Sequence, residues 1–492
     1  MGTFYTCHFH RRARGIEIEN YECPADGHSV EQPLAKDDVP EDPRNWWLER
    51  GPGLVPSRSG RGLPSNSSTS ACAPPWAGLL PELQALILGR LEVADYLRFA
   101  AVCRSWCSTV AERPCLPKPQ IPWLMLSDST RDPDTRRFFS QPDQKMYKIH
   151  LPEIHGRLCI GSSEGWLITV DELSELHALN PLTGASLALP SVATFFDVAG
   201  VVRDSDGRIT DYVIGYDNLG EVPYEVEHMR SYYHLKAILD HSSAAVAVIH
   251  GEFNDLSFAH AGDESWTALQ PPVPRIFWDI IFRKGLLHAM AISGALVVFD
   301  LDAPGSPVVV TCVERPHSQK WEQQGCCFNQ KYLVESPDGK DLFQVWRDLR
   351  WLPVDGNGWR ESILPGDARM TVAFAIFKLD ERRNEWSEVK DLGDVALFLG
   401  LNHSMALSTR EFPELTSSSI YFTDDYNRDG YEMDQQVIHD IGVFNLTDGS
   451  FQPYDFHSID SEWNWPPQIW FTPLLSQACP LQVPSHDGGS TR

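Results

Sequence analysis

The residues best placed to bind a metal ion lie in an acidic segment in the C-terminal part of the chain. Asp425, Asn427 and Asp429 alternate and Gly430 follows, as in the first half of a calcium-binding loop. The twelfth position is Gln436 instead of the bidentate glutamate, and the flanking sequences are typical of strands instead of the helices of an EF-hand. We therefore expect an acidic hairpin loop without a bound metal ion.

No set of residues in the sequence matches a catalytic signature. There is no phosphate-binding P-loop, no G-x-S-x-G nucleophile elbow, no H-E-x-x-H zinc motif and no glycine-rich dinucleotide turn. Cys103 and Cys107 lie one helical turn apart without further ligands nearby, which indicates small core residues. We expect no catalytic residue, no metal and no cofactor, and therefore a protein that is not an enzyme.

Composition and charge narrow the possible partners. Of 492 residues, 42% are hydrophobic, enough for a sizeable core, and the 67 acidic residues exceed the 41 basic ones to give a net charge of −26. This balance repels phosphate backbones and anionic lipid, so nucleic acid is not an expected partner. No apolar run reaches the length of a membrane span, no signal peptide is visible and the eleven cysteines are scattered, so we expect a soluble protein of the cytoplasm and/or nucleus.

The elements that must position any functional residue begin after a long N-terminal segment. Residues 1–74 show no sustained hydrophobic periodicity, and residues 51–70 are dominated by glycine, proline and serine. We expect residues 1–74 to be a disordered extension and linker.

A helical unit is predicted over residues 75–116. Leucine and isoleucine follow three- and four-residue steps from Leu80 to Leu91, and Pro81 stands where a first helical turn tolerates proline. Asp95 is placed to cap a second helical run that extends to Val110. Because so small a unit has more apolar surface than it can cover, we expect it to be buried against something else.

The remainder of the chain is predicted to be β structure. Short apolar runs alternate with Gly, Asp, Asn and Pro turns over residues 122–478, before a flexible tail at 479–492. Strand pairs recur at intervals often near forty residues, and a tryptophan follows the turn in two of them, at Trp266 and Trp386. A β-propeller explains this pattern better than the alternative, a large β-sandwich, but the number of blades stays open.

The helical unit resembles the F-box, whose pattern is L-P-x-[DE]-L, aliphatic residues, a D-x-L step and VC-x-x-W. LLPEL at 79–83, DYL at 95–97 and VCRSW at 102–106 carry the resemblance, although Leu80 stands where the family usually has its proline, which follows here at Pro81. The resemblance implies binding to the Skp-type adaptor of a cullin–RING ubiquitin ligase, and the alternative is a helical cap on the propeller. The resemblance assigns adaptor contact to eight residues, some of which serve internal packing: Leu79, Leu80, Pro81, Leu83, Ile87, Leu91, Val102 and Trp106.

The remainder is similar to plant F-box proteins with a KIB-type β-propeller, formerly a domain of unknown function. The residues that carry this likeness are PWLML at 122–126, GSSEGWL at 161–167, LNPLTG at 179–184 and SIYFTDD at 419–425. The expected fold is therefore mainly β, a C-terminal propeller preceded by a small all-α F-box.

This resemblance implies a substrate-recognition subunit of a Skp–cullin–F-box ubiquitin ligase, in which the F-box binds the adaptor, and through it cullin, while the propeller binds a target protein. The acidic excess favours a target with a basic surface. Two alternatives stay open: a propeller enzyme or small-molecule-binding protein with its ligand in the central channel, and a receptor whose propeller recruits nothing for degradation. The sequence places no substrate-binding residue.

Overall fold

The structure is a computed structural model of the whole chain, which divides into two units, residues 22–80 and residues 1–21 with 81–492. The residues that it describes are 16–20, 75–91, 93–112, 120–127, 132–141, 144–216, 220–273, 276–304, 306–317, 330–353, 367–425, 440–453 and 468–474. Of the first unit only residues 75–80 are described, with the helical turn η1 (Pro75–Gly78). The predicted tail at 479–492 lies outside the described residues.

Three short helices form the predicted α-helical unit. They are α2 (Pro81–Leu88), α3 (Val93–Val102) and α4 (Arg104–Glu112). The expected second helix is in fact two, because the chain leaves the helical conformation at Cys103. Asp95 does not cap it, since α3 begins two residues earlier and Asp95 pairs with Arg98 within the helix.

The helices do not have to bury their inner faces alone. Leu88, Val93, Tyr96, Phe99 and Val110 belong to one buried cluster with aromatic and aliphatic residues of the first strands that follow. This packing supplies the burial that so small a unit lacks by itself.

Seven sheets account for the strands of the described part of the chain, and their paired strands are antiparallel apart from one parallel pair, β24 with β26. The first two sheets contain β1 (Ile16–Asn20), β2 (Trp123–Met125), β3 (Thr135–Ser140), β4 (Lys145–His150) and β29 (Ile469–Phe471), and then β5 (Leu158–Ser163), β6 (Trp166–Val170), β7 (Leu176–Leu179) and β8 (Ser186–Leu187). The third and fourth contain β9 (Val198–Arg203), β10 (Ile209–Tyr216) and β11 (Gly220–Glu225), and then β12 (His234–Asp240), β13 (Ala245–His250), β14 (Asp255–His260) and β15 (Thr267–Ala268).

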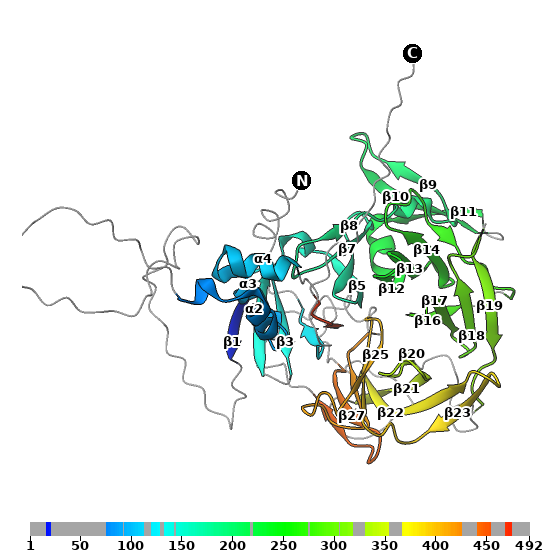
Figure 1. The fold of residues 1–492 in the computed structure, drawn as a ribbon. Coiled ribbons are helices and arrows are strands. Elements are labelled where there is room, and N and C mark those ends of the chain that lie inside the picture. The colour runs from blue at the N-terminus through cyan, green and yellow to red at the C-terminus, as the bar shows by residue number, and fades with distance from the viewer. Residues whose placement is uncertain are drawn as a thin grey trace, which may run out of the picture. The chain divides into compact units, whose positions relative to one another are not determined.

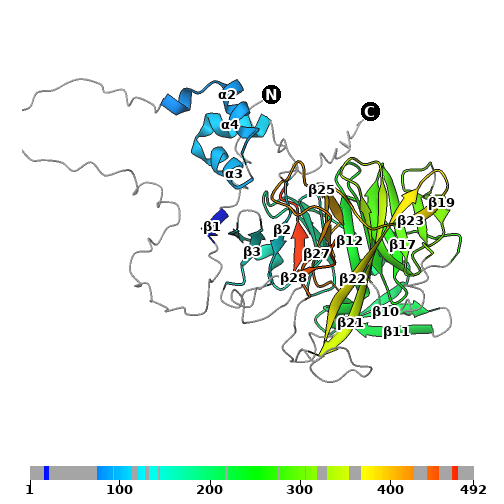
Figure 2. The same cartoon turned by 90° about the horizontal axis from the view of Figure 1, so that it is seen from below.

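The other three sheets follow in chain order. They contain β16 (Phe277–Arg283), β17 (Leu286–Ala291), β18 (Leu296–Asp300) and β19 (Val308–Val313); β20 (Gln330–Glu335), β21 (Leu342–Pro353), β22 (Asp367–Asp380) and β23 (Glu385–Val389); and β24 (Val395–Leu399), β25 (Met405–Ser408), β26 (Ser419–Phe422), β27 (Gly442–Asn445) and β28 (Phe451–Pro453). The longest pair, β21 with β22, forms an extended hairpin (Figure 2). Short helical segments connect some strands: η2 (Pro152–Ile154), η3 (Val192–Thr194), α5 (Val226–His228) and η4 (Met229–Tyr233).

Six of these sheets are the blades of a propeller (Figure 1). Their inner strands contact one another in turn, β29 with β5, β5 with β12, β12 with β16, β16 with β20 and β20 with β25. Each pair of neighbouring blades also shares a buried apolar cluster, including the last blade with the first. The sheet β9–β11 lies outside this ring, because the inner strands of the blades before and after it contact directly. The predicted fold class, a β-propeller preceded by a small α-helical unit, is confirmed.

The first blade closes the ring by joining the two ends of the β region. Strand β29 pairs antiparallel with β2, so that Trp123 lies opposite Phe471. Strand β1 adds to the other edge of this blade, where Ile16 lies opposite Ile149 of β4. The prediction of an unstructured extension over residues 1–74 is therefore wrong for residues 16–20, because five residues of alternating pattern find a sheet edge that the sequence did not show. Residues 1–15 and 21–74 lie outside the described residues.

Candidate functional site

Helix α2 turns its apolar side outward. Leu83, Leu86 and Ile87 follow three- and four-residue spacing on one face, and their exposed fractions are 45%, 65% and 38%. The opposite face carries the buried Gln84 and Leu88. A surface helix of a globular protein normally has the reverse arrangement, so this face has the character of a surface that a partner covers.

A buried amide holds α2 in this orientation. The Gln84 side chain is fully buried, and its Oε1 accepts a hydrogen bond of 2.5 Å from the Thr109 hydroxyl of α4. Its Nε2 lies 3.4 Å from the Ser105 hydroxyl of the same helix. Because a buried amide without partners is costly, rotating α2 to bury its leucines would sacrifice these bonds.

The structure divides the predicted adaptor-contact residues into two groups. The exposed ones are Leu80, Pro81, Leu83, Ile87 and Val102. The partly buried ones are Leu79, Leu91 and Trp106.

The partly buried Leu91 and Trp106 pack against the cluster beneath the helices, and the Trp106 ring stacks on Phe99 with 4.1 Å between centroids. These two residues therefore support the unit from inside. Leu86 was not among the predicted contacts although it is the most exposed of the three on α2, and its three-residue step from Leu83 was the signal that could have found it.

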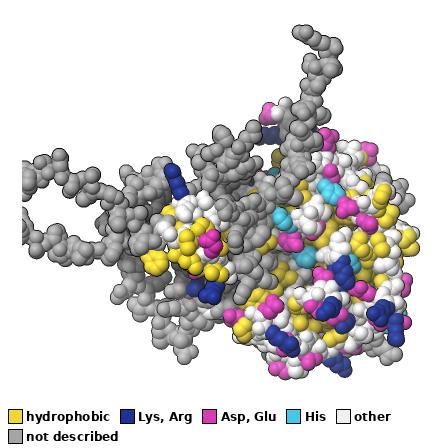
Figure 3. Space-filling model, viewed as in Figure 1, with side chains coloured by type: hydrophobic (Ala, Val, Ile, Leu, Met, Phe, Trp, Pro, Cys, Tyr) yellow, Lys and Arg dark blue, Asp and Glu magenta, His cyan; other side chains and the backbone are white. Residues whose placement is uncertain are grey.

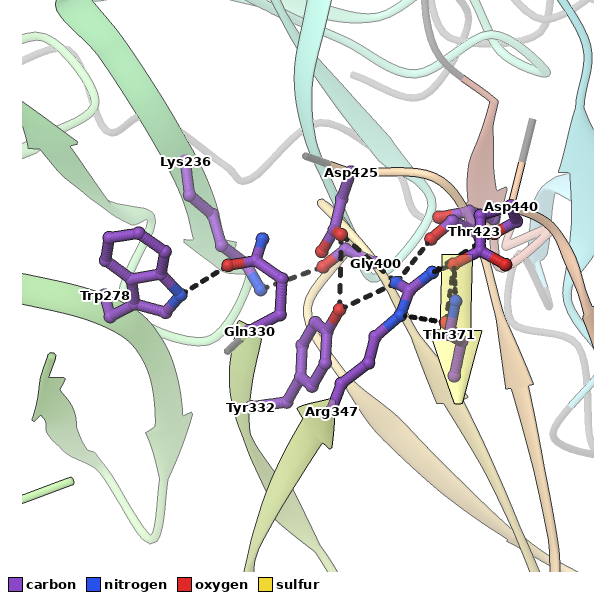
Figure 4. A network of polar contacts seen from close by, with 10 residues as sticks. All are labelled: Lys236, Trp278, Gln330, Tyr332, Arg347, Thr371, Gly400, Thr423, Asp425 and Asp440. Atoms are coloured by element: carbon purple, nitrogen blue, oxygen red, sulfur yellow. Dashed lines mark hydrogen bonds and ion pairs between the residues drawn. The ribbon is translucent and has the colours of Figure 1, made fainter. Parts of the chain in front are cut away.

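A second candidate site lies among the inner strands of the propeller (Figure 4). Lys236 of β12 and Asp279 of β16 form an ion pair of 2.5 Å, and both side chains are almost fully buried. Lys236 Nζ also donates to the Gly400 carbonyl at 3.2 Å, while Asp279 Oδ2 accepts the Leu333 backbone N–H of β20 at 2.6 Å. Burial raises the pKa of Asp279, although Lys236 and the backbone donors act to lower it.

A buried arginine, Arg347, joins the fifth and sixth blades of the propeller. Arg347 of β21 donates to Tyr332 at 3.0 Å and to Asp440 Oδ2 at 2.8 Å, and lies 3.3 Å from Asp425 Oδ1 (Figure 4). It also donates to the Thr423 carbonyl at 2.8 Å. Burial acts to lower the pKa of Arg347, but the adjacent tyrosine and aspartates raise it by more. The net pKa is therefore above its ordinary value, and the guanidinium stays charged.

Asp425, the first residue of the calcium-loop-like segment, is bound by the residues around Arg347. Asp425 accepts hydrogen bonds from Tyr332 and Arg347, so its carboxylate points into the protein. Asn427, Asp429, Gly430 and Gln436 lie outside the described residues. Among the residues that the structure does describe, no group of three His, Cys, Asp or Glu side chains gathers as metal ligands would.

The cavity between these clusters is small. Its volume is about 20 Å³, and its lining includes Lys236, Trp278, Gln330 and Asp425. Trp278 Nε1 donates to Gln330 Oε1 at 2.6 Å across it (Figure 4). A cavity of this size holds about one water molecule. The polar groups that converge here therefore bind mainly one another, and in doing so they link four blades.

Known proteins share both parts of this architecture. A match to the F-box domain covers residues 76–118, and a match to the KIB1-4 beta-propeller covers residues 138–445. The chain is 26% identical over 418 residues to F-box protein SKIP23 of Arabidopsis thaliana, an alignment that covers 81% of this chain and 95% of the relative. It is 23% identical over 424 residues to F-box protein KIB3 of the same plant, covering 82% and 84% respectively.

Proposed function

Because the chain belongs to the F-box proteins with a KIB1-4 beta-propeller, we propose that it is the substrate-recognition subunit of a Skp–cullin–F-box ubiquitin ligase. The observation that carries this proposal is the outward apolar face of α2, defined by Leu83, Leu86 and Ile87. A Skp-type adaptor covers this face and connects the chain to cullin.

Burial of the α2 face supplies the affinity. Fully burying a leucine or isoleucine side chain is worth about 1.5–3 kcal/mol, and the buried Gln84 keeps the helix from turning these residues inward. Three such residues in the centre of an interface are of the kind that dominates binding energy. Val102, at the end of α3, is a further exposed apolar residue of the helical unit.

In this proposal the chain performs no chemical step itself. The propeller binds a target protein, and the assembly raises the concentration of that target near the ubiquitin-charged enzyme. The net charge of −26 supports a target with a basic surface, because complementary charge accelerates encounter. The buried ion pairs Lys236–Asp279 and Arg347–Asp440 support the same role, since each joins two neighbouring blades of the propeller that presents the binding surface.

The test is co-purification of the full chain with a Skp-type adaptor, followed by calorimetry. We expect a one-to-one complex for the wild type and no measurable binding for Leu83→Asp with Ile87→Asp, because two carboxylates would be desolvated on the apolar face. A matched control places the same charges on exposed valines outside the helices, Val202→Asp with Val273→Asp, and should bind as the wild type does.

Two results would overturn the proposal: no association of the wild type, or undiminished binding of the α2 variant. Both mutated side chains are partly exposed, so the variant should also keep the thermal unfolding midpoint of the wild type within a few degrees.

A further inference from the structure

The outer edges of the propeller blades differ in how they are protected. An unpaired edge strand presents free backbone donors and acceptors, and proteins usually guard it with shortness, charge or proline. Among the described strands, β8 and β15 have two residues each, β1 and β23 carry two glutamates each, and β28 ends in Pro453. In the sheet outside the ring, β9 contains Gly200 and Arg203, and β11 contains Pro223 and two glutamates.

Strand β19 lacks shortness, charge and proline, and its only edge protection among the described residues is a β-bulge. Its six residues, VVVTCV, include no charge and no proline, and most are β-branched. It is the outermost strand of its blade, and Figure 1 shows it on the rim of the ring. Within the described part of the chain, its backbone hydrogen bonds run to β18 alone. One β-bulge, between its pairs with Val298 and Phe299, is the only irregularity in this pairing.

The exposed side chains of β19 are apolar. Val308 and Val310 are 47% and 54% exposed, and Cys312 is also exposed, although the bulge places it opposite Val297 and so on the other face from Val308, which lies opposite Asp300. Hydrophobic side chains lie along this part of the rim in Figure 3. Strand and side chains together form a template on which a further strand can be added, with main-chain bonds for affinity and alternate side chains for specificity.

We propose that β19 is a docking edge, on which an extended segment of a partner protein adds as a fifth, antiparallel strand of this blade. The partner segment is uncharged and β-branched at its centre and carries lysine or arginine at both ends. The basic ends follow from exposed carboxylates on both sides of β19. Asp302, which lies in the loop before the strand and contacts His260, and Glu314, directly after the strand, are both exposed, whereas the following Arg315 is partly buried. The antiparallel direction follows from the blade, whose pairs are all antiparallel.

A second copy of this chain fits the edge less well. Antiparallel pairing of β19 with itself would bring the acidic ends of the two strands together, on chains that each carry a net charge of −26. Six residues span only about 20 Å of edge, which is short for a stable dimer that needs roughly 1,200 Å² of buried surface. A peptide segment requires no such area, and the inference does not depend on adaptor binding by α2.

The experiment uses the full chain and a synthetic, fluorescein-labelled peptide, KKVTVIVTKK, with EEVTVIVTEE as its charge-reversed control. We expect saturable binding of the lysine-flanked peptide in fluorescence anisotropy, at least tenfold tighter than that of the control, and weakening with salt. Hydrogen exchange should show new protection of the β19 amides when the peptide is bound.

The variant Val308→Lys with Val310→Lys should weaken binding of the lysine-flanked peptide at least tenfold, because it places like charges on the edge. Val202→Lys with Val273→Lys adds the same charge at exposed valines elsewhere and should leave binding within twofold. Retained thermal midpoints show that both variants fold.

Three results would overturn the proposal: no saturable binding, binding that the β19 variant leaves unchanged, or exchange protection that avoids β19. A sedimentation experiment in which the wild type is a dimer and the β19 variant a monomer would also overturn it, by identifying a second copy as the occupant.

Discussion

Replacing Lys236 by methionine tests whether the buried ion pair among the inner strands holds the propeller together. The side chain of Lys236 is 5% exposed and that of Asp279 is 1% exposed, so the substitution leaves a buried carboxylate without its cation. Removing one partner of a buried pair costs about 3–5 kcal/mol. For a domain of this size that loss corresponds to a fall of roughly 5 °C in the unfolding midpoint.

The same substitution should make stability depend on pH. Burial already raises the pKa of Asp279, and Lys236 opposes that rise, so its removal raises the pKa further. The folded variant then keeps a proton that the unfolded chain has released. Its stability should therefore fall as pH rises above the unfolded pKa of about 3.9, by about 1.4 kcal/mol per pH unit, until the folded pKa is passed.

The assay is thermal unfolding followed by tryptophan fluorescence at pH 6, 7 and 8. Lys236→Met should unfold below the wild type at pH 6 and further below it at each higher pH that precedes the folded pKa. The double variant Lys236→Met with Asp279→Asn keeps an acceptor for the Leu333 N–H and has no buried charge, so it should lose less stability and lack this pH dependence. Equal stability of Lys236→Met and the wild type at all three pH values would refute the reasoning.

Three further variants probe other contacts. Gly161→Ala would place a Cβ 1.8 Å from the Ala237 carbonyl on the next blade, and should cost about 1–3 kcal/mol in thermal unfolding, whereas Gly200→Ala, with nothing within 4 Å, should cost less. Gln84→Leu should cost about 1 kcal/mol by removing the hydrogen bond between α2 and Thr109, whose hydroxyl keeps the Ser105 carbonyl as a partner, while calorimetry at low temperature still detects adaptor binding. Asp255, whose pKa burial and a nearby carboxylate raise to about 6, favours the folded state when protonated. The contribution of Asp255 to the stability of the wild type is therefore fully present below about pH 4 and is lost as pH rises through about 6. Asp255→Asn should remove the fall of the unfolding midpoint between these two pH values.

The helical unit was largely predictable because its information is local. The three- and four-residue steps from Leu80 to Leu91 predict a helix, and α2 lies within that range. The break at Cys103 was not predictable, since helical spacing continues through it to Val110. Nor did periodicity alone show which side of α2 faces outward, because the buried Gln84 finds its partner on another helix, at Thr109.

The β region was predictable as a class but not as an arrangement. Short apolar runs between turn residues predict strands wherever they occur, and their repetition favours a propeller. The six blades and their closure depend on pairings such as Trp123 opposite Phe471, which no local pattern specifies. Strand β1 is the same case at the other edge of the first blade, since it is joined to β4 across more than a hundred residues.

The sequence by itself determined the character of the elements: an F-box-like helical unit, a β region of propeller type and a strongly acidic chain. These follow from residue types and short spacings, which act within a few residues. Only the tertiary structure decided which groups are buried together, among them Lys236 with Asp279 and Arg347 with Asp440. Each pair joins residues of two consecutive blades, and the packing of neighbouring blades is what brings them within hydrogen-bond distance.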